Sequence, residues 1–124
     1  MIQLDTSFLI RSLVPDSAES HQLRRWIEDG ESIGISALAW TEFLCGPVTA
    51  RVIALAEDLL GDPVPLDKRE AALGAKLFNE TGRRRGSLID CMIAATALAA
   101  GDPVATSNRD DFARFEQLGL ILAS

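Results

Sequence analysis

Cysteine and histidine are scarce in this 124-residue sequence, which contains two cysteines, Cys45 and Cys91, and one histidine, His21. Both cysteines lie in apolar segments with helical spacing, where a free cysteine behaves as a small hydrophobic residue. A fold that depends on disulfides is therefore not expected. His21 stands beside Glu19 and Ser20 on a polar helix face, where we expect it to be solvated. The sequence thus offers neither a cysteine–histidine nucleophile nor a cysteine–histidine pattern of metal ligands.

Long hydrophobic runs are absent as well. No apolar run reaches the roughly 18–20 residues that a membrane span requires, and the amino terminus, MIQLDTSF, lacks the basic and apolar regions of a signal peptide. The composition, 48% hydrophobic and 24% charged, is that of an ordinary globular protein. There is no internal repeat or linker. We therefore expect a single domain, residues 1–124, located in the cytoplasm.

The chain also lacks the excess of positive charge that contacts to nucleic-acid phosphates usually require, because its net charge is −6. The basic residues are unevenly distributed, however. The segment GRRRG (82–86) places three arginines in a row, and Arg109 and Arg114 follow in the last part of the chain. The net charge by itself therefore does not exclude a nucleic-acid partner.

Short apolar runs alternate with helical patterns along the whole sequence. Strands are expected at 2–5, 32–36, 63–66, 103–107 and 120–123, and helices at 6–13, 18–30, 37–46, 48–61, 67–82, 87–101 and 108–119. This alternation predicts an α/β fold of three layers, with a mainly parallel central sheet of about five short strands flanked by helices.

Acidic residues stand where two of the expected strands end. Asp5 closes the first strand, and Asn108, Asp110 and Asp111 follow the fourth. In open α/β sheets, ligands bind beyond the carboxyl ends of the strands. If the strands are parallel, these residues lie along the same edge of the sheet.

Two further acidic residues lie inside helices that are otherwise uncharged. Asp90 is the one charged residue of SLIDCMIAATALAAG (87–101), and Glu42 is the one charged residue of SALAWTEFLCG (36–46). Burying an ionised carboxylate is costly unless a positive group pairs with it. Acids from four parts of the chain could therefore converge on one pocket, and such a set of hard oxygen ligands suits Mg²⁺ or Mn²⁺.

Each of these acids also has a purely structural interpretation. Asp5 could cap the helix that follows it, Asp90 could close a capping box with Ser87, and the acids after the fourth strand could be solvated turn residues. Glu42 lies too deep in its helix to act as a cap, so its structural alternative is an exposed side chain. Position alone does not decide between the two interpretations.

Four sequence blocks occur in order along the chain: LDTS near the start, TEF at 41–43, DCMIAATAL at 90–98 and ATSNRDDF at 105–112. Their order and spacing, over essentially all 124 residues, resemble the motifs of PIN domains and, more narrowly, of the VapC-type toxins of bacterial toxin–antitoxin pairs. The resemblance implies a metal-dependent endoribonuclease on a PIN fold, with its acidic cluster at the carboxyl edge of a parallel sheet.

The resemblance also implies roles for individual residues. Catalytic positions match Asp5, Glu42, Asp90 and Asp111, and supporting positions match Thr6, Ser107, Asn108 and Asp110. Asp5 and Asp90 would ligate Mg²⁺ or Mn²⁺, while Glu42 and Asp111 would help to ligate the metal or to orient the attacking water. Asn108 occupies the family's fourth acidic position, so the number of metal ions stays open.

Arginines are the candidate contacts for RNA phosphates. They are Arg83, Arg84, Arg85 and Arg109. Solvated surface charge is the alternative role for all four, because basic runs often have no other function.

Partners follow from the resemblance too. VapC-type relatives are held inactive by a cognate antitoxin and usually form homodimers, and the amphipathic helices around Trp26 and Ile53 could supply the surfaces.

A catalytically inactive PIN-like module that binds RNA or protein is the main alternative, because Asn108 replaces one acid. A phosphotransfer domain with Asp5 as nucleophile is disfavoured, since Ser7 stands where a haloacid-dehalogenase-type site has a second aspartate. The RNA target stays open.

Overall fold

A small parallel sheet forms the centre of the protein. In the computed structural model, which describes residues 1–124, β1 (Ile2–Leu4) lies between β2 (Ile33–Ile35) and β3 (Val104–Ala105). Both pairings are parallel, and Leu4 pairs with Ile35 on one side and with Ala105 on the other. All three residues of β1 are buried, as expected of a parallel sheet that is covered on both faces.

The sheet contains fewer strands than the sequence predicted. Two of the five expected segments, 63–66 and 120–123, form only single parallel bridges, Ser36 with Val64 and Val104 with Leu122. The first of these segments reads PVPL, and its prolines cannot donate ladder hydrogen bonds. Val64 pairs next to β2 and Leu122 pairs with β3, at the two edges of the sheet. All five segments therefore run side by side, although only three are strands.

Seven α-helices connect these segments. They are α1 (Thr6–Ser12), α2 (Ala18–Glu28), α3 (Ala37–Cys45), α4 (Ala50–Leu60), α5 (Lys68–Glu80), α6 (Leu88–Ala100) and α7 (Arg109–Ala113), followed by the 3₁₀ turn η1 (Glu116–Leu118). The helix expected at 108–119 is thus divided into α7 and η1. None of the helices combines the length and the apolar character that crossing a membrane requires.

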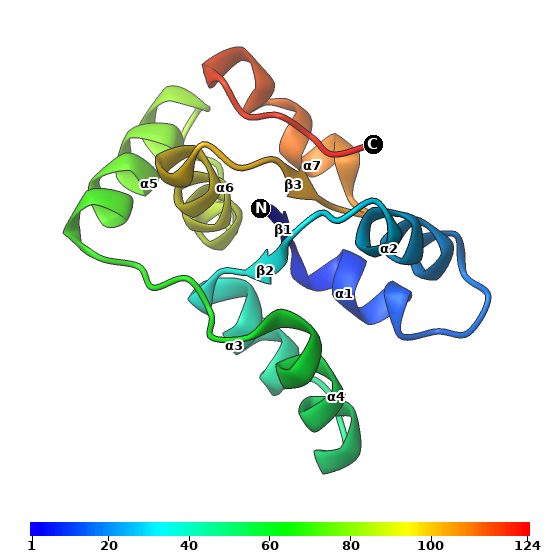
Figure 1. Ribbon diagram of the computed structural model, residues 1–124. Coiled ribbons are helices and arrows are strands. Elements are labelled where there is room, and N and C mark those ends of the chain that lie inside the picture. Colours follow the sequence, from blue (N-terminus) through cyan, green and yellow to red (C-terminus); the bar gives the residue numbers. More distant parts are fainter.

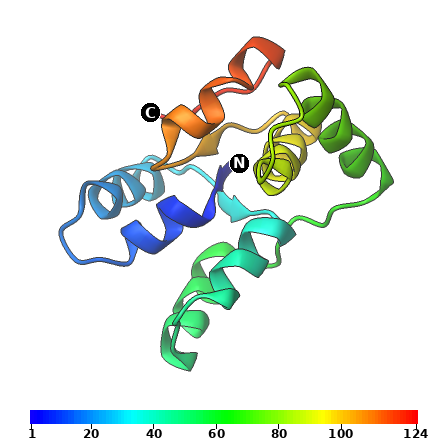
Figure 2. The same cartoon turned by 180° about the vertical axis from the view of Figure 1, so that it is seen from behind.

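The helices cover both faces of the sheet, which gives the three layers that the sequence predicted. Helices α1 and α2 lie on one side, and α5 and α6 lie on the other (Figures 1 and 2). Helices α3 and α4 form a hairpin that projects away from the sheet. The carboxyl ends of β1, β2 and β3 therefore open toward α1, α3 and α7, the helices that follow them in the chain.

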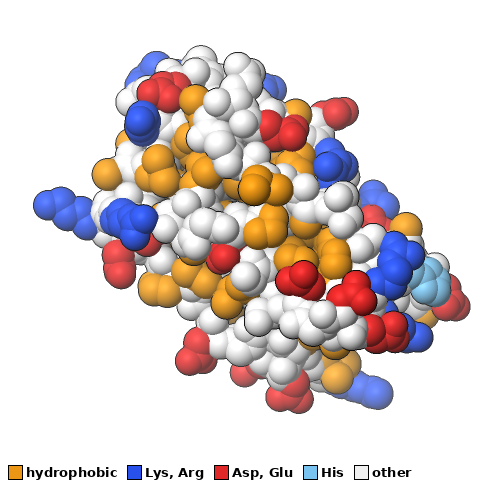
Figure 3. Space-filling model, turned by 45° about the horizontal axis from the view of Figure 1, so that its top comes forward, with side chains coloured by type: hydrophobic (Ala, Val, Ile, Leu, Met, Phe, Trp, Pro, Cys, Tyr) orange, Lys and Arg blue, Asp and Glu red, His pale blue; other side chains and the backbone are white.

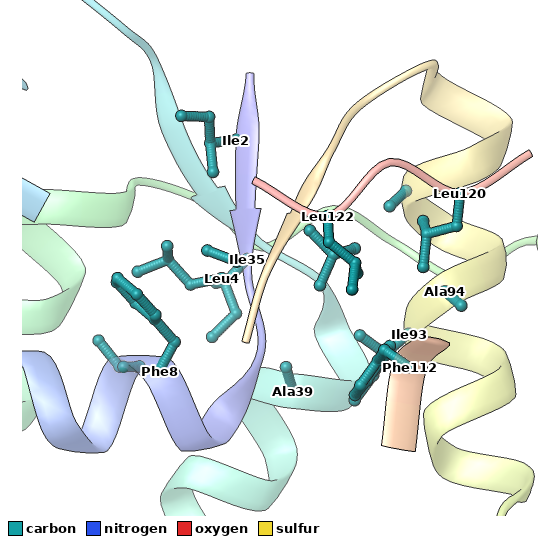
Figure 4. Close-up of a cluster of buried hydrophobic side chains, with 14 of the residues drawn as sticks. Ile2, Leu4, Phe8, Ile35, Ala39, Ile93, Ala94, Phe112, Leu120 and Leu122 are labelled. Atoms are coloured by element: carbon teal, nitrogen blue, oxygen red, sulfur yellow. The ribbon is translucent and has the colours of Figure 1, made fainter. Parts of the chain in front are cut away.

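The hydrophobic core lies between the sheet and its covering helices. In Figure 4, Leu4 and Ile35 of the sheet lie between Phe8 of α1 on one side and Ile93 of α6 on the other. Trp26 stacks on Phe8 with a distance of 5.4 Å between ring centroids, and its side chain is buried. Trp26 is therefore part of the core, whereas its neighbour Ile27 on α2 is 46% exposed. A partner surface on this helix stays a prediction.

Candidate active site

Asp5 lies at the carboxyl end of β1, and its buried side chain caps α1. Its Oδ1 accepts hydrogen bonds from the backbone N–H groups of Ser7 (2.5 Å) and Phe8 (3.3 Å) and from the Ser7 hydroxyl (2.7 Å). Its Oδ2 accepts one hydrogen bond, from the Thr106 hydroxyl at 2.6 Å. A carboxylate oxygen has two lone pairs, so Oδ2 keeps the capacity to bind a second group. Asp5 is a cap, but the capping function uses only one of its oxygens.

Asp90 lies in the first turn of α6 and is half-buried. The capping box that the sequence allowed with Ser87 does not form, because the Ser87 hydroxyl donates to the carbonyl of Arg84 at 2.6 Å instead. The Asp90 carboxylate takes part in none of the hydrogen bonds or ion pairs of the structure. This carboxylate is therefore free to bind a group from outside the protein.

The electrostatic surroundings of Asp90 bring the candidate acids together. Burial is the main reason why the pKa of Asp90 rises from its ordinary value of 3.8 to about 6, and the charge of Asp5 is the second. Arg114 lowers this pKa, whereas Glu42 and Asp111 raise it further. A carboxylate responds in this way only to charges nearby. Three acids and one arginine from separate elements thus lie near enough to Asp90 to affect its charge.

Glu42 reaches the cluster from α3 and is held by Thr6. The Thr6 hydroxyl lies 2.9 Å from Oε1 of Glu42 and 3.1 Å from the carbonyl oxygen of Ala39. Because Thr6 directly follows Asp5 in the chain, this contact ties α3 to the end of β1. The same contact lets the Thr6 hydroxyl orient the Glu42 carboxylate.

The hydroxyl groups after β3 are arranged differently from the expectation. Thr106, not Ser107, contacts Asp5, and it also accepts a hydrogen bond from the backbone N–H of Asn108 at 2.9 Å. The Ser107 hydroxyl donates to Oε2 of Glu19 on α2 at 2.9 Å. Ser107 therefore fixes α2 against the site and does not itself hold a cluster carboxylate.

Ser7 and Thr106 are functional candidates that sequence reasoning missed. The Ser7 hydroxyl donates to Asp5 and accepts from the backbone N–H of Ser107 at 3.1 Å, so it links the ends of β1 and β3. A serine two residues after a capping aspartate is a signal for such a contact. The choice between Thr106 and Ser107 had no comparable local signal.

The two acids in the first turn of α7, Asp110 and Asp111, differ in their effect on Asp90. Asp111 raises the pKa of Asp90, whereas Asp110 is not among the groups that act on it. Asn108 precedes α7, and its exposed side chain makes no capping hydrogen bond. Asp111 is therefore the acid of this segment that belongs to the cluster.

The candidate arginines do not form one patch. Arg83 lies over the Phe78 ring, 5.3 Å from its centroid, and Arg109 donates to the carbonyl of Ala123 at 2.9 Å. Arg84 and Arg85 are exposed. On the face shown in Figure 3, lysine and arginine side chains lie scattered toward the edges.

Arg114 is the one basic residue that lowers the pKa of Asp90, and sequence reasoning did not assign it to the site. Its guanidinium carbon lies 4.5 Å from the centroid of the Phe115 ring, and Nη1 donates to the carbonyl of Asp111 at 2.5 Å. The Nε and Nη2 atoms are buried and have no hydrogen-bond partner. Arg114 thus offsets part of the negative charge of the cluster without forming an ion pair with it.

The donor set fits a hard divalent cation bound partly through water. No three acidic, histidine or cysteine side chains lie close enough together to hold a metal ion by themselves. Mg²⁺ commonly uses one or two carboxylates and keeps several of its waters. Asp5, with a free lone pair on Oδ2, and Asp90, with no partner, would be those two carboxylates if a metal binds here.

Replacement of Thr106 by valine tests how the cluster is held. Thr106→Val removes the donor to Asp5 and the acceptor for the N–H of Asn108. We expect the free energy of unfolding, measured by urea denaturation, to fall by about 1–3 kcal/mol. Thr106→Ser keeps the hydroxyl and is the matched control. Equal stability of the two variants would contradict the importance of this hydroxyl.

The chain is thus a three-layer α/β domain with acidic side chains at the carboxyl edge of its parallel sheet. The model of the PIN domain family matches residues 2–118, and the chain belongs to that family. The family membership and the fold class that the sequence predicted are thereby confirmed. No curated protein matches the sequence.

Solved structures similar to this chain include members of toxin–antitoxin systems. VapBC2 of Rickettsia felis, bound to a DNA fragment from its promoter, matches with a TM-score of 0.79 and 20% identity over 99% of this chain and 98% of that chain. FitAcB of Neisseria gonorrhoeae matches with a TM-score of 0.71 and 23% identity over 100% and 97%. VapBC-5 of Mycobacterium tuberculosis matches with a TM-score of 0.60 and 26% identity over 98% of each chain. Family and neighbours together support a PIN nuclease toxin of the VapC type.

Proposed function

We propose that the protein is a divalent-metal-dependent endoribonuclease that hydrolyses RNA phosphodiester bonds as the toxin of a type II toxin–antitoxin pair. One observation carries the proposal. Asp5, Glu42 and Asp111 all raise the pKa of Asp90, which indicates that carboxylates directly after β1 and in α3, α6 and α7 lie near one another, and the Asp90 carboxylate has no hydrogen-bond partner within the protein. A stable fold gains nothing from such mutual repulsion, whereas a cation bound among the acids would relieve it.

The roles of the acids follow from their contacts. Asp5 and Asp90 would hold Mg²⁺ or Mn²⁺, because each has an oxygen available. When bound, the metal would activate a water molecule for attack and offset the negative charge that develops on the phosphate. Glu42 has one oxygen held by Thr6, which leaves the other to orient the water and accept its proton. Asp111, in the first turn of α7, would share that task.

Phosphate contacts are proposed for arginines near the cluster. Arg84 and Arg114 line a common pocket of about 300 Å³ beside the end of α5. Arg109 directly follows Asn108 in the chain and lines the pocket beside α2. Arg83 is less available, because its guanidinium lies on Phe78. Single arginines around the acids, rather than a broad basic surface, would position the RNA.

The proposed partners are an antitoxin and a second copy of the chain, in the cytoplasm. The named neighbours are toxin–antitoxin complexes, which supports an antitoxin here. Several large apolar side chains are exposed, among them Ile10 on α1, Val14 just after it, Leu44 on α3 and Leu55 on α4. Exposed apolar side chains of this kind are typical of protein interaction surfaces.

The direct test is RNA cleavage by the purified chain without antitoxin. We expect total cellular RNA to be cleaved in Mg²⁺ or Mn²⁺ and not in EDTA, and Asp90→Asn to reduce cleavage by about 100-fold or more, because a ligand of the reacting metal is lost. Asp110→Asn is the matched control, since Asp110 lies outside the cluster.

Two results would contradict the proposal. The first is equal cleavage by the wild type and the folded Asp90→Asn variant. The second is absence of cleavage together with absence of Mn²⁺ binding in a calorimetric titration, which would favour the catalytically inactive module.

A further inference from the structure

A pocket of about 260 Å³ adjoins the acidic cluster on the side of α2. The buried rings of Phe8 and Trp26 line its apolar part. Its polar part comes from α2 and from the segment after β3, and consists of Glu19, Gln22, Arg25, Thr106 and Arg109. Pockets for drug-sized ligands begin at roughly 300 Å³, so this one suits a group the size of a single nucleobase.

The pocket shares a wall with the proposed catalytic site. Thr106 lines the pocket, while its hydroxyl lies 2.6 Å from Oδ2 of Asp5. Ser107, the next residue, holds Glu19 at the pocket. A nucleotide with its base in the pocket would therefore lie beside the acids, with the Arg109 guanidinium available to its phosphate.

The hydrogen-bonding groups of the pocket are only partly used by the protein. Oε2 of Glu19 accepts from Ser107, and Oε1 has no protein donor. Nη2 of Arg25 donates to Oε1 of Gln22 at 2.6 Å, which leaves the Gln22 amide N–H groups and the remaining Arg25 donors free. The pocket thus offers one carboxylate acceptor beside several donors.

Guanine is the base that matches this set. Its Watson–Crick edge carries two neighbouring donors, N1–H and N2–H, which a carboxylate accepts together, and its O6 and N7 atoms accept from arginine. Adenine, cytosine and uracil each carry a single donor on the Watson–Crick edge, so none of them offers a carboxylate two neighbouring donors. Apolar side chains beside the polar groups are typical of sites that bind unpaired RNA bases.

We propose that the pocket between α2 and the segment after β3 binds a guanine base of the RNA next to the bond that is cut, with Glu19 reading the base. The inference rests on the proposed function for its RNA, but its binding step can be tested without cleavage. Glu19 is then a specificity-determining residue, and Ser107 positions it.

Nucleotide binding can be followed through Trp26, because the chain has only two tryptophans. In a Trp40→Phe background Trp26 is the one remaining reporter. We expect GMP, titrated in EDTA, to change its fluorescence and to bind about tenfold or more tightly than AMP, CMP or UMP. Glu19→Gln keeps an acceptor for Ser107 but replaces the carboxylate, and should remove this preference. Glu28→Gln, on the exposed face of α2, is the control and should keep it.

Mapping of cleavage sites gives the second readout. In wild-type digests a guanine should be enriched at one fixed position beside the cut, and Glu19→Gln should lower that enrichment about tenfold. Equal binding of all four nucleotides, no binding at all, or an unchanged preference in Glu19→Gln would overturn the inference. Binding of GMP by a protein that cuts no RNA would leave the pocket intact and overturn the proposed function instead.

Discussion

Replacing Asp5 with alanine is expected to lower the free energy of unfolding by about 2–4 kcal/mol and to abolish metal-dependent RNA cleavage. The buried carboxylate accepts hydrogen bonds from the N–H groups of Ser7 and Phe8 and from the hydroxyls of Ser7 and Thr106. Alanine would leave these donors without an acceptor, and buried donors left unpaired cost about 1–3 kcal/mol each unless water reaches them. Loss of a helix cap typically costs about 1 kcal/mol. Urea denaturation measures the change.

Asp5→Asn separates the two roles of this residue. Asparagine is a good N-cap and still accepts hydrogen bonds from the backbone of α1. The free energy of unfolding of the variant should therefore stay within about 1 kcal/mol of the wild-type value. Asparagine lacks the charge that attracts a divalent cation, so cleavage should still be lost. A stable and fully active Asp5→Asn variant would show that Asp5 is a cap and nothing more.

Replacing Asp90 with asparagine is expected to have the opposite effect on stability. Its pKa is raised to about 6 from an ordinary value of 3.8, so the folded state binds a proton more tightly than the unfolded chain. The free energy of unfolding therefore falls as the pH rises between these two values, and the ionised carboxylate weakens the fold above about pH 6. The difference between these two pKa values corresponds to about 3 kcal/mol. Solvent screening of this half-exposed group reduces the expected effect to about 1–2 kcal/mol.

Thermal and urea denaturation in EDTA test this prediction. Asp90→Asn should be more stable than the wild type at pH 8, and the difference should disappear toward pH 4. Mg²⁺ should stabilise the wild type by mass action and should not stabilise the variant. Asp110→Asn serves again as the control and should change neither property. A destabilised Asp90→Asn variant at pH 8 would mean that this carboxylate supports the fold.

Asp5 and Asp90 therefore differ in what they contribute to stability, although both are proposed to bind the metal. Asp5 is needed for both the fold and the proposed chemistry, because its oxygens hold the start of α1 and face the other acids. Asp90 is kept at some cost to stability, since it has no partner within the protein. Opposite stability changes with the same loss of cleavage would identify one acid as a structural ligand and the other as a purely functional one.

Local features of the sequence determined most of the secondary structure and the membership of the family. Ser17 and Ser36 cap helices that begin at the predicted residues 18 and 37, because an N-cap acts within three residues of itself. Thr49 caps α4, which begins at Ala50, two residues after the predicted start. The alternation of apolar strands and helices is equally local and gave the three layers. The order of the four sequence blocks predicted a PIN domain, and the match to the family model confirms this prediction.

The tertiary structure alone decided which polar groups meet. Whether Thr106 or Ser107 contacts Asp5 depends on how the end of β3 lies against the start of α1, and adjacent hydroxyls carry no signal of that choice. The free carboxylate of Asp90 and the presence of Arg114 beside the acids result from the packing of α6 against α7. The pocket at Glu19 likewise exists only because α2 lies against the segment after β3. Contacts between residues far apart in the chain depend on the whole packing arrangement, and the sequence pattern around each residue does not contain it.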